Sequence, residues 1–313
     1  MQAQNLLRAW LAFKLTNSEL ALGFVMFAIA VPMFFLAPVG GMMADRKDRR
    51  NLIITGQITV FSVDLLILIL LQTGYLEFWH LLCSAGILGC SFPFIMPARN
   101  AIVVNVVGKD NLEKATAINM GGINVSRVVG PAAAGFLIDF FGAANAYGLG
   151  VMLYGIGILF MLRVDNSRPE PESLSLSARE SIMEGFAYIR SNRLVFVLLL
   201  FGLVPLFLAM PFQNLLVVFA EKVWHVGARG FGLLGAAFGV GGIVGAIWVA
   251  VNKDIHHHLK KMMTSVMLFG LVLFFFAISP YFLLGLFLAF LANVFMSVFN
   301  TMNNTSIQLL IPD

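Results

Sequence analysis

Nine long apolar runs constrain this chain more than any other feature of its sequence. A helix that crosses a bilayer needs roughly 20 mainly apolar residues, because the hydrocarbon core is about 30 Å thick and a helix rises about 1.5 Å per residue. Residues 1–15 look like the second half of one more such helix. The pattern therefore predicts an all-α, polytopic membrane protein. The nine runs are residues 20–43, 52–72, 78–102, 115–140, 143–163, 194–220, 230–251, 262–280 and 281–302.

The composition excludes the other broad classes of protein. Of the 313 residues, 59% are hydrophobic and 12% are charged, whereas soluble domains have about 45–50% and about 25%. A soluble monomer with this balance would expose too much hydrocarbon, and a disordered chain needs low hydrophobicity and high charge. The 2 cysteines, Cys83 and Cys90, lie in one apolar run, where we expect buried thiols and neither a disulfide nor a metal site.

Basic residues orient the predicted helices. The net charge of +4 could indicate a nucleic-acid partner, but Lys and Arg fall in short clusters between the apolar runs. Loops 44–51, 99–114, 163–193 and 252–261 hold four, three, five and three of them, and the opposite side of the membrane holds three in all. Because cytoplasmic loops are enriched in Lys and Arg, the first group is predicted to be cytoplasmic. We expect a multi-pass protein of the plasma membrane (the bacterial inner membrane) that contacts the lipid bilayer and no nucleic acid.

One loop is long enough to separate two groups of helices. Residues 164–193 are polar and contain Pro169 and Pro171. The loop predicts an N-terminal bundle at 1–163, a cytoplasmic linker at 164–193 and a C-terminal bundle at 194–313.

The strongest local motif is GGMMADRKDRR, residues 40–50, on a predicted cytoplasmic turn. From Gly41 it resembles the loop signature of the major facilitator superfamily, with Asp48 in the place of a glycine. We expect Gly41 to permit close helix approach, and Asp45 to cap the next helix and to pair with arginines of a neighbouring span. An ordinary positive-inside turn is the plainer interpretation. The predicted conformational latch consists of Gly41, Asp45, Arg46, Arg49 and Arg50.

A second motif lies in the predicted span 115–140. It resembles the antiporter motif of the same superfamily, with alanine and serine in place of some glycines. Small residues let helix backbones approach, and proline bends the helix. The resemblance implies export rather than uptake, and simple packing of small residues is the alternative. The matched positions are Ser126, Gly130, Pro131, Ala134 and Gly135.

The resemblance extends along the whole chain. Stretches such as PARNAIVVNVV (97–107) and EGFAYIRSNRLV (184–195) are similar to exporters of the siderophore and macrolide type, in the drug:proton antiporter branch. This resemblance implies twelve helices in two six-helix bundles, with a central cavity, alternating access and use of the proton gradient. Against that fold the sequence is expected to be a fragment, which holds part of helix 1 through helix 10 and lacks helices 11 and 12.

Three charged residues, Arg8, Asp64 and Arg127, lie inside predicted spans. A charge at this depth is costly and normally faces the bundle interior, where it has a partner. Asp64 and Arg127 lie at similar depths, about 12 residues from the cytoplasmic starts of their helices. We therefore expect Asp64 to pair with Arg8 or with Arg127. Such a pair is either a static brace of the first bundle or a proton-coupling site in which Asp64 titrates.

The predicted function is secondary active transport, in which an amphipathic small molecule of the drug or siderophore type leaves by proton-coupled efflux. Its partners are the small molecule and protons, and we expect a monomer when the protein is full length. The sequence contains no P-loop and no H-E-x-x-H motif, so neither an enzyme nor a cofactor is expected. The alternatives are a truncated, non-transporting remnant or membrane scaffold, and a lipid transporter of the same fold.

Overall fold

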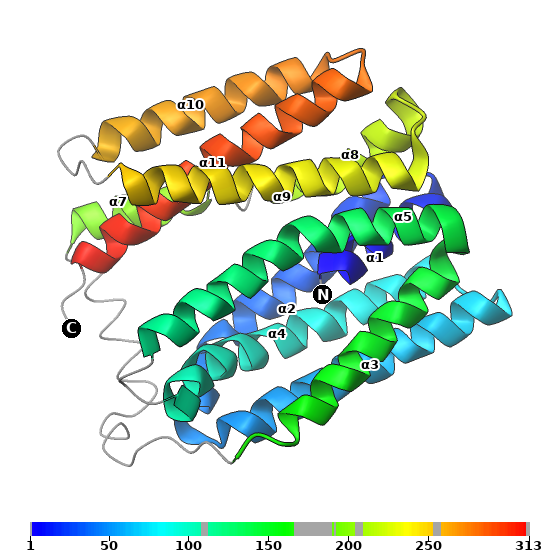
Figure 1. Ribbon diagram of the computed structural model, residues 1–313, viewed down its shortest axis with the longest axis horizontal. Coiled ribbons are helices and arrows are strands. Elements are labelled where there is room, and N and C mark those ends of the chain that lie inside the picture. The colour runs from blue at the N-terminus through cyan, green and yellow to red at the C-terminus, as the bar shows by residue number, and fades with distance from the viewer. Residues whose placement is uncertain are drawn as a thin grey trace. The chain divides into compact units, whose positions relative to one another are not determined.

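Helices make up all the regular structure in the residues that this computed structural model describes, which are 2–107, 112–165, 190, 192–203, 209–252 and 258–310 (Figure 1). Among these residues, seven helices are long and apolar enough to cross a membrane. The prediction of an all-α, polytopic membrane protein is confirmed. The helices are α1 (Gln2–Thr16), α2 (Glu19–Arg46), α3 (Arg49–Thr73), α4 (Phe78–Val107), α5 (Leu112–Met161), α7 (Arg193–Phe201), α8 (Met210–Val218), the π-helix η4 (Phe219–Val223), α9 (Gly227–Val251), α10 (His258–Ala277) and α11 (Phe282–Leu310).

Two of the predicted spans lie in α5, which consists of two helices that join at Gly142. α5 covers both 115–140 and 143–163, and it breaks at Gly142, whose φ of 80° and ψ of 163° are not helical. Glycine adopts a positive φ without the steric cost of a Cβ atom. Within the predicted run 194–220, the described residues contain α7, α8 and the start of η4, and α8 continues directly into this π-helix.

The chain divides into two compact units. The first contains residues 3–123 and 141–184, and the second contains 124–140 and 185–313. The sequence placed all of 1–163 in one bundle, whereas here the 124–140 segment of α5 groups with the second unit. The physical reason is that this segment packs closely against α9.

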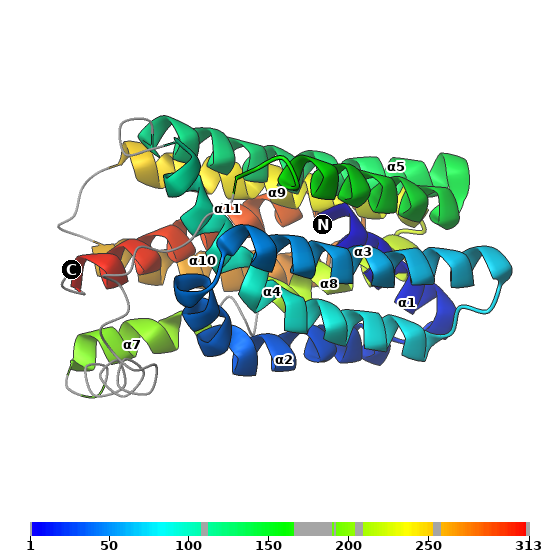
Figure 2. The ribbon, with the colours of Figure 1, turned by 90° about the horizontal axis from the view of Figure 1, so that it is seen from below.

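In the first unit, α2 and α3 both pack along α4, and Figure 2 shows α2 beside α4. Glycines allow the backbones to touch. A Cβ atom on Gly40 of α2 would collide with the backbone of Pro93, and one on Gly89 of α4 would collide with the backbone of Ile29. Close backbone approach through small residues is the usual way in which membrane helices associate, because lipid supplies no hydrophobic force between them.

In the second unit, α9 lies between the 124–140 segment and α11. Gly135 and Gly232 face each other, since a Cβ atom on Gly232 would lie 2.7 Å from the Cα atom of Gly135. On the α11 side, Asn293 donates a hydrogen bond from Nδ2 to the carbonyl oxygen of Phe238 at 2.6 Å. α9 is therefore tightly packed on two sides.

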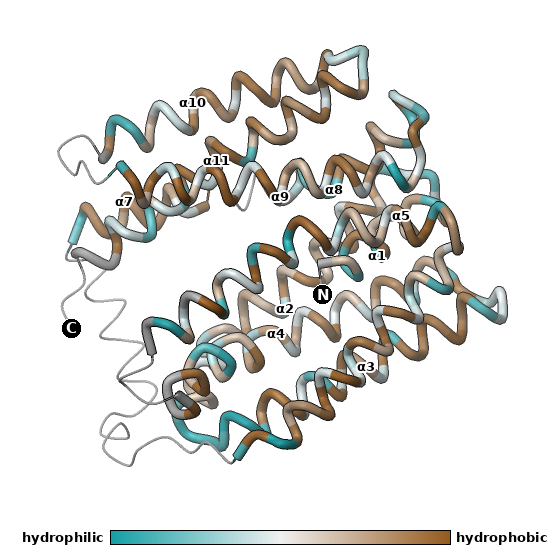
Figure 3. The backbone as a smooth tube through the Cα atoms, in the orientation of Figure 1, coloured by the Kyte–Doolittle hydropathy of each residue, from teal (hydrophilic) through white to brown (hydrophobic). Residues whose placement is uncertain are grey.

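Hydropathy along the backbone agrees with a membrane environment. Figure 3 shows apolar residues over most of each long helix and hydrophilic residues mainly near helix ends. On α2, the side chains of Phe27, Phe34 and Phe35 are exposed, as lipid-facing residues are. Cys83 and Cys90 are also exposed on α4, so the expectation that both thiols are buried was wrong. An apolar residue in a membrane helix is stable on the lipid side as well as in the core.

Candidate functional site

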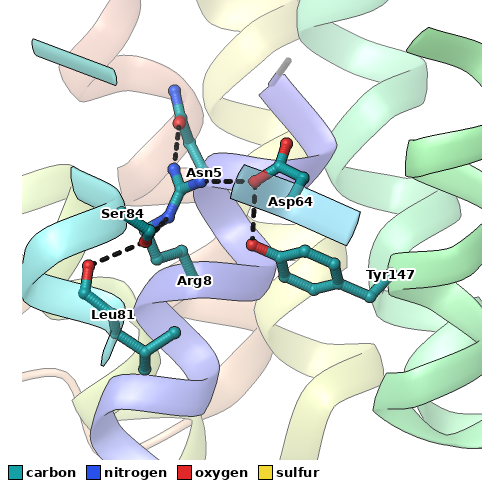
Figure 4. A network of polar contacts seen from close by, with 6 residues as sticks. All are labelled: Asn5, Arg8, Asp64, Leu81, Ser84 and Tyr147. Carbon is teal, nitrogen blue, oxygen red and sulfur yellow. Dashed lines mark hydrogen bonds and ion pairs between the residues drawn. The ribbon is translucent and has the colours of Figure 1, made fainter. Parts of the chain in front are cut away.

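A buried polar network joins four helices of the first unit (Figure 4). Arg8 on α1 donates from Nη2 to Oδ1 of Asp64 on α3 at 2.9 Å. Tyr147 on α5 donates its hydroxyl to the same carboxylate oxygen at 3.2 Å. Arg8 also donates from Nε to the hydroxyl oxygen of Ser84 on α4 at 3.2 Å. Only 2% of Arg8 and 1% of Asp64 is exposed, so this ion pair is shut off from solvent.

The neighbours of Arg8 fix the orientation of its guanidinium. Nη1 donates to Oδ1 of Asn5 at 3.5 Å. Ser84 donates its hydroxyl hydrogen to the carbonyl oxygen of Leu81 at 2.8 Å. The hydroxyl oxygen can therefore accept the hydrogen bond from Arg8. All three guanidinium nitrogens therefore have a partner.

Two buried polar atoms near this pair lack a hydrogen-bond partner within the described part of the chain: Oδ2 of Asp64 and Nε2 of Gln4. Gln4 lies against Gly150 of α5, where a Cβ atom would be 3.0 Å from Nε2. Buried polar groups are nearly always satisfied in proteins, so each exception calls for an explanation. Val60 and Val63 of α3 and Ile87 and Leu88 of α4 lie around the ion pair and Ser84.

The electrostatics of the pair make it sensitive to a single proton. Removing two charges from water is expensive, and here each charge is compensated chiefly by the other. A proton on the free oxygen of Asp64 would neutralise the carboxylate and remove its Coulomb attraction to Arg8. The arrangement can therefore link the protonation of one side chain to contacts among four helices.

Two of the three predicted intramembrane charges form an ion pair within the first unit. The structure pairs Asp64 with Arg8. Arg127 lies on the 124–140 segment of α5, in the second unit, where its side chain is exposed. Of the two partners considered for Asp64, the structure contains Arg8.

Sequence reasoning missed Tyr147 and Ser84. The chain has 5 tyrosines, and Tyr147 falls inside a predicted span, where a phenolic hydroxyl needs a hydrogen-bond partner. That was the available signal. Ser84 gave no comparable signal, because serine commonly satisfies its hydroxyl on its own helix, as Ser91 does on the carbonyl oxygen of Ile87.

The turn at residues 40–50 is capped differently from the prediction. Asp48, not Asp45, is the N-cap of α3, and its Oδ1 accepts a hydrogen bond from the backbone N–H of Asn51 at 3.3 Å. Asp45 still belongs to α2, which ends at Arg46, and it is exposed. The expectation that Asp45 caps the next helix was wrong, because α2 extends beyond it.

The glycine assignment in this turn also changes. Among the residues that the structure describes, a Cβ atom on Gly41 would meet no atom within 4 Å, whereas one on Gly40 would collide with Pro93. The close helix approach therefore depends on Gly40, and the expectation for Gly41 was wrong. Adjacent helix positions point in directions about 100° apart, so only one of two neighbouring glycines can lie at such a contact.

The arginines of the turn bind helix ends within the first unit. Arg50 donates from Nη2 to the carbonyl oxygen of Leu162 at 2.7 Å and from Nε to that of Met161 at 3.4 Å. Arg49 donates from Nε to the carbonyl oxygen of Ala44 at 3.3 Å. The last carbonyls of a helix lack intrahelical donors and carry partial negative charge. Arg50 thus joins the start of α3 to the end of α5.

The second motif lies at the contact of α5 with α9. Pro131, Ala134 and Gly135 are buried, Gly130 is partly buried and Ser126 is exposed. A Cβ atom on Gly232 of α9 would lie 2.7 Å from the carbonyl oxygen of Pro131. These small residues bring the two helix backbones together in the second unit.

No group of three or more His, Cys, Asp or Glu residues in the described part of the chain could hold a metal ion.

The amino-acid sequence is similar to a known protein family and to curated bacterial exporters. A family model described as "Transmembrane secretion effector" matches residues 1–313. The chain is 23% identical to Macrolide efflux protein A of Enterococcus faecalis over 256 residues, which cover 80% of this chain and 77% of that protein. It is 28% identical to the Enterobactin exporter EntS of Citrobacter koseri over 278 residues, which cover 87% of this chain and 64% of that protein. The chain spans between about half and about three quarters of the length of the curated relatives it matches.

A solved structure shares the arrangement of helices. A bacterial homologue of the iron transporter ferroportin, in its inward-facing state, matches with a TM-score of 0.70 and 16% identity, and the match covers 100% of this chain and 82% of the other. At this identity the likeness shows the fold alone.

Proposed function

Because the chain belongs to the transmembrane secretion effector family, within the major facilitator superfamily, we propose that it exports an amphipathic small molecule of the drug or siderophore type in exchange for protons. It is a multi-pass membrane protein with the major facilitator fold, of the bacterial inner membrane. The relatives described as a macrolide efflux protein and an enterobactin exporter support export as the direction of transport.

The observation that carries proton coupling is the buried pair of Arg8 and Asp64. A proton from the outer side binds the unpartnered Oδ2 of Asp64, and the carboxylate becomes a neutral carboxyl group. The attraction to Arg8 is lost, and the packing of α1, α3, α4 and α5 around the pair changes. On the cytoplasmic side the proton leaves, and the ion pair forms again.

Alternating access converts this cycle into export. The protein binds its substrate from the cytoplasm with Asp64 ionised, and releases it outside when Asp64 takes up a proton. A ligand or a proton shifts such an equilibrium only by the difference in its affinity for the two states. Here the difference in proton affinity comes from the surroundings of Asp64. In one state its carboxylate is buried and ionised beside Arg8, and in the other state it is protonated and no longer attracted to Arg8.

We assign the cytoplasmic turn the role of a latch for this change. The bonds of Arg50 to the last carbonyls of α5 hold two helix ends together, and Asp45, Arg46 and Arg49 add charge to the same turn. Interactions of this kind select one packed arrangement of helices over another. Gly41 is an open position of the latch, because a Cβ atom there would meet no atom of the described residues within 4 Å.

Uptake into everted membrane vesicles tests the proposal. Respiration acidifies the vesicle interior, so an exporter should accumulate radiolabelled erythromycin or a catecholate siderophore there. We expect accumulation several-fold above vesicles without the protein, and a protonophore should abolish it. Asp64→Asn should abolish it as well while the protein still purifies as a single species. Asp139→Asn, which removes an exposed carboxylate of α5, is the matched control and should behave like wild type.

Two results would contradict the proposal in different ways. Absence of energised uptake of either compound by the wild type would reject export. Uptake by Asp64→Asn that remains sensitive to the protonophore would reject Asp64 as the proton carrier and leave the ion pair as a static brace.

A further inference from the structure

Buried polar atoms without a hydrogen-bond partner occur at successive depths in the first unit. Within the described part of the chain, this unit contains four of them, which are Oδ2 of Asp64, Nε2 of Gln4, Oε1 of Gln57 and Oδ2 of Asp48. Asp64 belongs to the ion pair, and Asp48 is the N-cap of α3 at the predicted cytoplasmic turn. The two amide groups come from helices that meet between these ends, so we looked for one explanation that covers all four atoms.

The position of Gln57 follows from a seven-residue spacing along α3. Arg50, Gln57 and Asp64 are seven residues apart, and seven residues return a helix to nearly the same face after about 10.5 Å. At one end of this stripe, Arg50 donates to the carbonyl oxygen of Met161 on α5. At the other end, Asp64 accepts from Tyr147 on α5 (Figure 4). Gln57 therefore faces α5, midway between the ion pair and the turn.

Tyr154 occupies the matching position on α5. It lies seven residues after Tyr147 and seven residues before Met161. The two helices run in opposite directions along this contact, so Tyr154 is level with Gln57. Its hydroxyl is close enough to interact electrostatically with Asp64. A hydroxyl and an amide thus lie at the same depth, about three turns from the ion pair or less.

Gln4 lies between the levels of the two tyrosines. It precedes Arg8 by about one turn of α1, and only 3% of it is exposed. Its amide packs against Gly150 of α5, which falls between Tyr147 and Tyr154. From the ion pair toward the turn, the polar side chains therefore follow in the order Asp64, Gln4, Tyr154 with Gln57, and Asp48.

A proton that leaves Asp64 for the cytoplasm has a long way to travel. Asp48 and Asp64 are sixteen residues apart on α3, which corresponds to about 24 Å. The sequences of α1, α4 and the 143–161 part of α5 contain no carboxylate. The basic groups near this path already have partners, since Arg8 is bound to Asp64 and Arg50 to helix carbonyls. Hydroxyl, amide and water are therefore the groups left to conduct the proton.

We propose that Tyr154 and Gln57 conduct the proton of Asp64 to the cytoplasmic turn, together with a file of water molecules bound by the four unpartnered atoms. Buried water usually bonds polar groups that protein atoms leave unsatisfied. Nε2 of Gln4 donates to such a water, and Oε1 of Gln57 accepts from one. This inference rests on the proposed proton coupling and adds to it the route on the cytoplasmic side.

The proton balance of the path is simple. The carboxyl group of Asp64 loses its O–H proton to the first water and becomes a carboxylate. Each water and the hydroxyl of Tyr154 then accept one proton on oxygen and release another toward the turn, so they end as they began. The carboxylate of Asp48 receives the proton and passes it to bulk water. The amides of Gln4 and Gln57 position water and do not exchange protons.

Two variants interrupt the path at one level. Tyr154→Phe removes the hydroxyl, and Gln57→Leu removes the amide at similar volume. In proteoliposomes with a trapped pH-sensitive dye, either change should slow the proton movement that a gradient of erythromycin or enterobactin drives. We expect a rate about tenfold lower, as when one hydrogen bond is lost from a rate-limiting step. Exchange of labelled compound at equal concentrations on both sides should keep the wild-type rate, because exchange passes no proton to the cytoplasm.

Each variant has a matched control. Tyr281→Phe removes a hydroxyl from an exposed ring before α11. Thr59→Val removes a hydroxyl of α3 that bonds to its own helix, at the carbonyl oxygen of Thr55. Both controls should move protons at the wild-type rate.

Thermal unfolding separates conduction from packing. Replacing an unpartnered buried amide by an apolar side chain removes a polar group without breaking a bond between protein groups. The unfolding midpoint of Gln57→Leu should therefore equal or exceed that of wild type. If Gln57→Leu lowers both the midpoint and the rate of compound exchange, Gln57 has a packing role and the inference is overturned.

Radiolytic hydroxyl labelling gives a readout that does not depend on transport, because radiation generates radicals from water bound beside a side chain. Tyr154 should be oxidised in the wild type, and the extent should fall several-fold in Gln57→Leu. Absence of labelling at Tyr154 in the wild type would contradict a file of water at this level.

The remaining outcomes separate the route from the function on which it rests. If Asp64→Asn abolishes proton movement while Tyr154→Phe and Gln57→Leu retain the wild-type rate, the route is overturned and Asp64 remains the carrier. If Asp64→Asn moves protons at the wild-type rate, or if wild type transports neither compound, the proposed function is rejected and the route falls with it.

Discussion

In the state that the structure shows, Arg8 and Asp64 compensate each other's buried charge. Replacing Arg8 by methionine keeps much of the volume but leaves the Asp64 carboxylate buried without its counter-charge. Breaking a buried pair in this way typically costs about 3–5 kcal/mol. We therefore predict a clearly lower midpoint of thermal unfolding for Arg8→Met in detergent, measured by intrinsic fluorescence.

The double variant Arg8→Met/Asp64→Leu is the control for that prediction. It removes both charges, and replacing a buried pair by apolar residues is often neutral or stabilising. Its unfolding midpoint should lie much closer to wild type than that of Arg8→Met. Equal midpoints for the single and double variants would mean that the charge of Asp64 is already compensated without Arg8.

The two charges of this site could be predicted from the sequence, and their polar neighbours could not. Arg8 and Asp64 interrupt apolar runs, where a charge is conspicuous. The hydroxyl of Tyr147 needs a hydrogen-bond partner inside a membrane span, but the sequence does not say which group supplies it. Its contact with Asp64 depends on which helices lie side by side, and the hydropathy pattern does not contain that information.

At the scale of helices, Gly40 and Gly41 are neighbours with opposite surroundings. Gly40→Ala would place a methyl group against the backbone of Pro93, whereas the methyl group of Gly41→Ala would meet open space. Overpacking typically costs about 1–3 kcal/mol, and alanine favours a helix over glycine by about 0.5–1 kcal/mol. We predict a lower unfolding midpoint for Gly40→Ala and an equal or higher one for Gly41→Ala. A reversed order would contradict the assigned contact of α2 with α4.

The cap of α3 gives a second prediction at this scale. Asp48→Ala removes the side-chain acceptor for the N–H of Asn51 and should cost about 1 kcal/mol of unfolding free energy, whereas Asp48→Gly should cost only a few tenths. This tolerance explains how the superfamily signature can have glycine at the position of Asp48. Thermal unfolding of the two variants measures the difference, and Asp45→Ala should have a smaller effect than Asp48→Ala. A larger loss of unfolding free energy for Asp45→Ala than for Asp48→Ala would indicate that Asp45, and not Asp48, caps α3.

The helices themselves follow closely from the apolar pattern, because a span must satisfy its own backbone hydrogen bonds and so must be a helix. The grouping of the helices does not follow. The sequence assigned 124–140 to the first bundle because it is contiguous with it. Packing assigns the segment to the second unit, through glycine contacts such as that of Gly135 with Gly232.

For the whole molecule, the distribution of Lys and Arg predicts which ends of the helices face the cytoplasm. In a background with Cys83 and Cys90 replaced by serine, Tyr75→Cys should react with a membrane-impermeant maleimide in intact spheroplasts, because the turn between α3 and α4 is predicted to be external. Lys47→Cys should react only after permeabilisation. Labelling of Lys47→Cys in intact spheroplasts, and of Tyr75→Cys only after permeabilisation, would show that the topology is the reverse of the predicted one. The direction assigned to the transport cycle would then be reversed as well.

Export by this protein depends, in our account, on one proton moving on and off Asp64. The most direct measurement is of proton movement in proteoliposomes that contain a trapped pH-sensitive dye, while a gradient of the exported compound drives the cycle. Wild type should move protons opposite to the compound, and Asp64→Asn should exchange compound across the membrane without moving protons. Substrate movement by wild type with no change of internal pH, or proton movement by Asp64→Asn at the wild-type rate, would contradict the account.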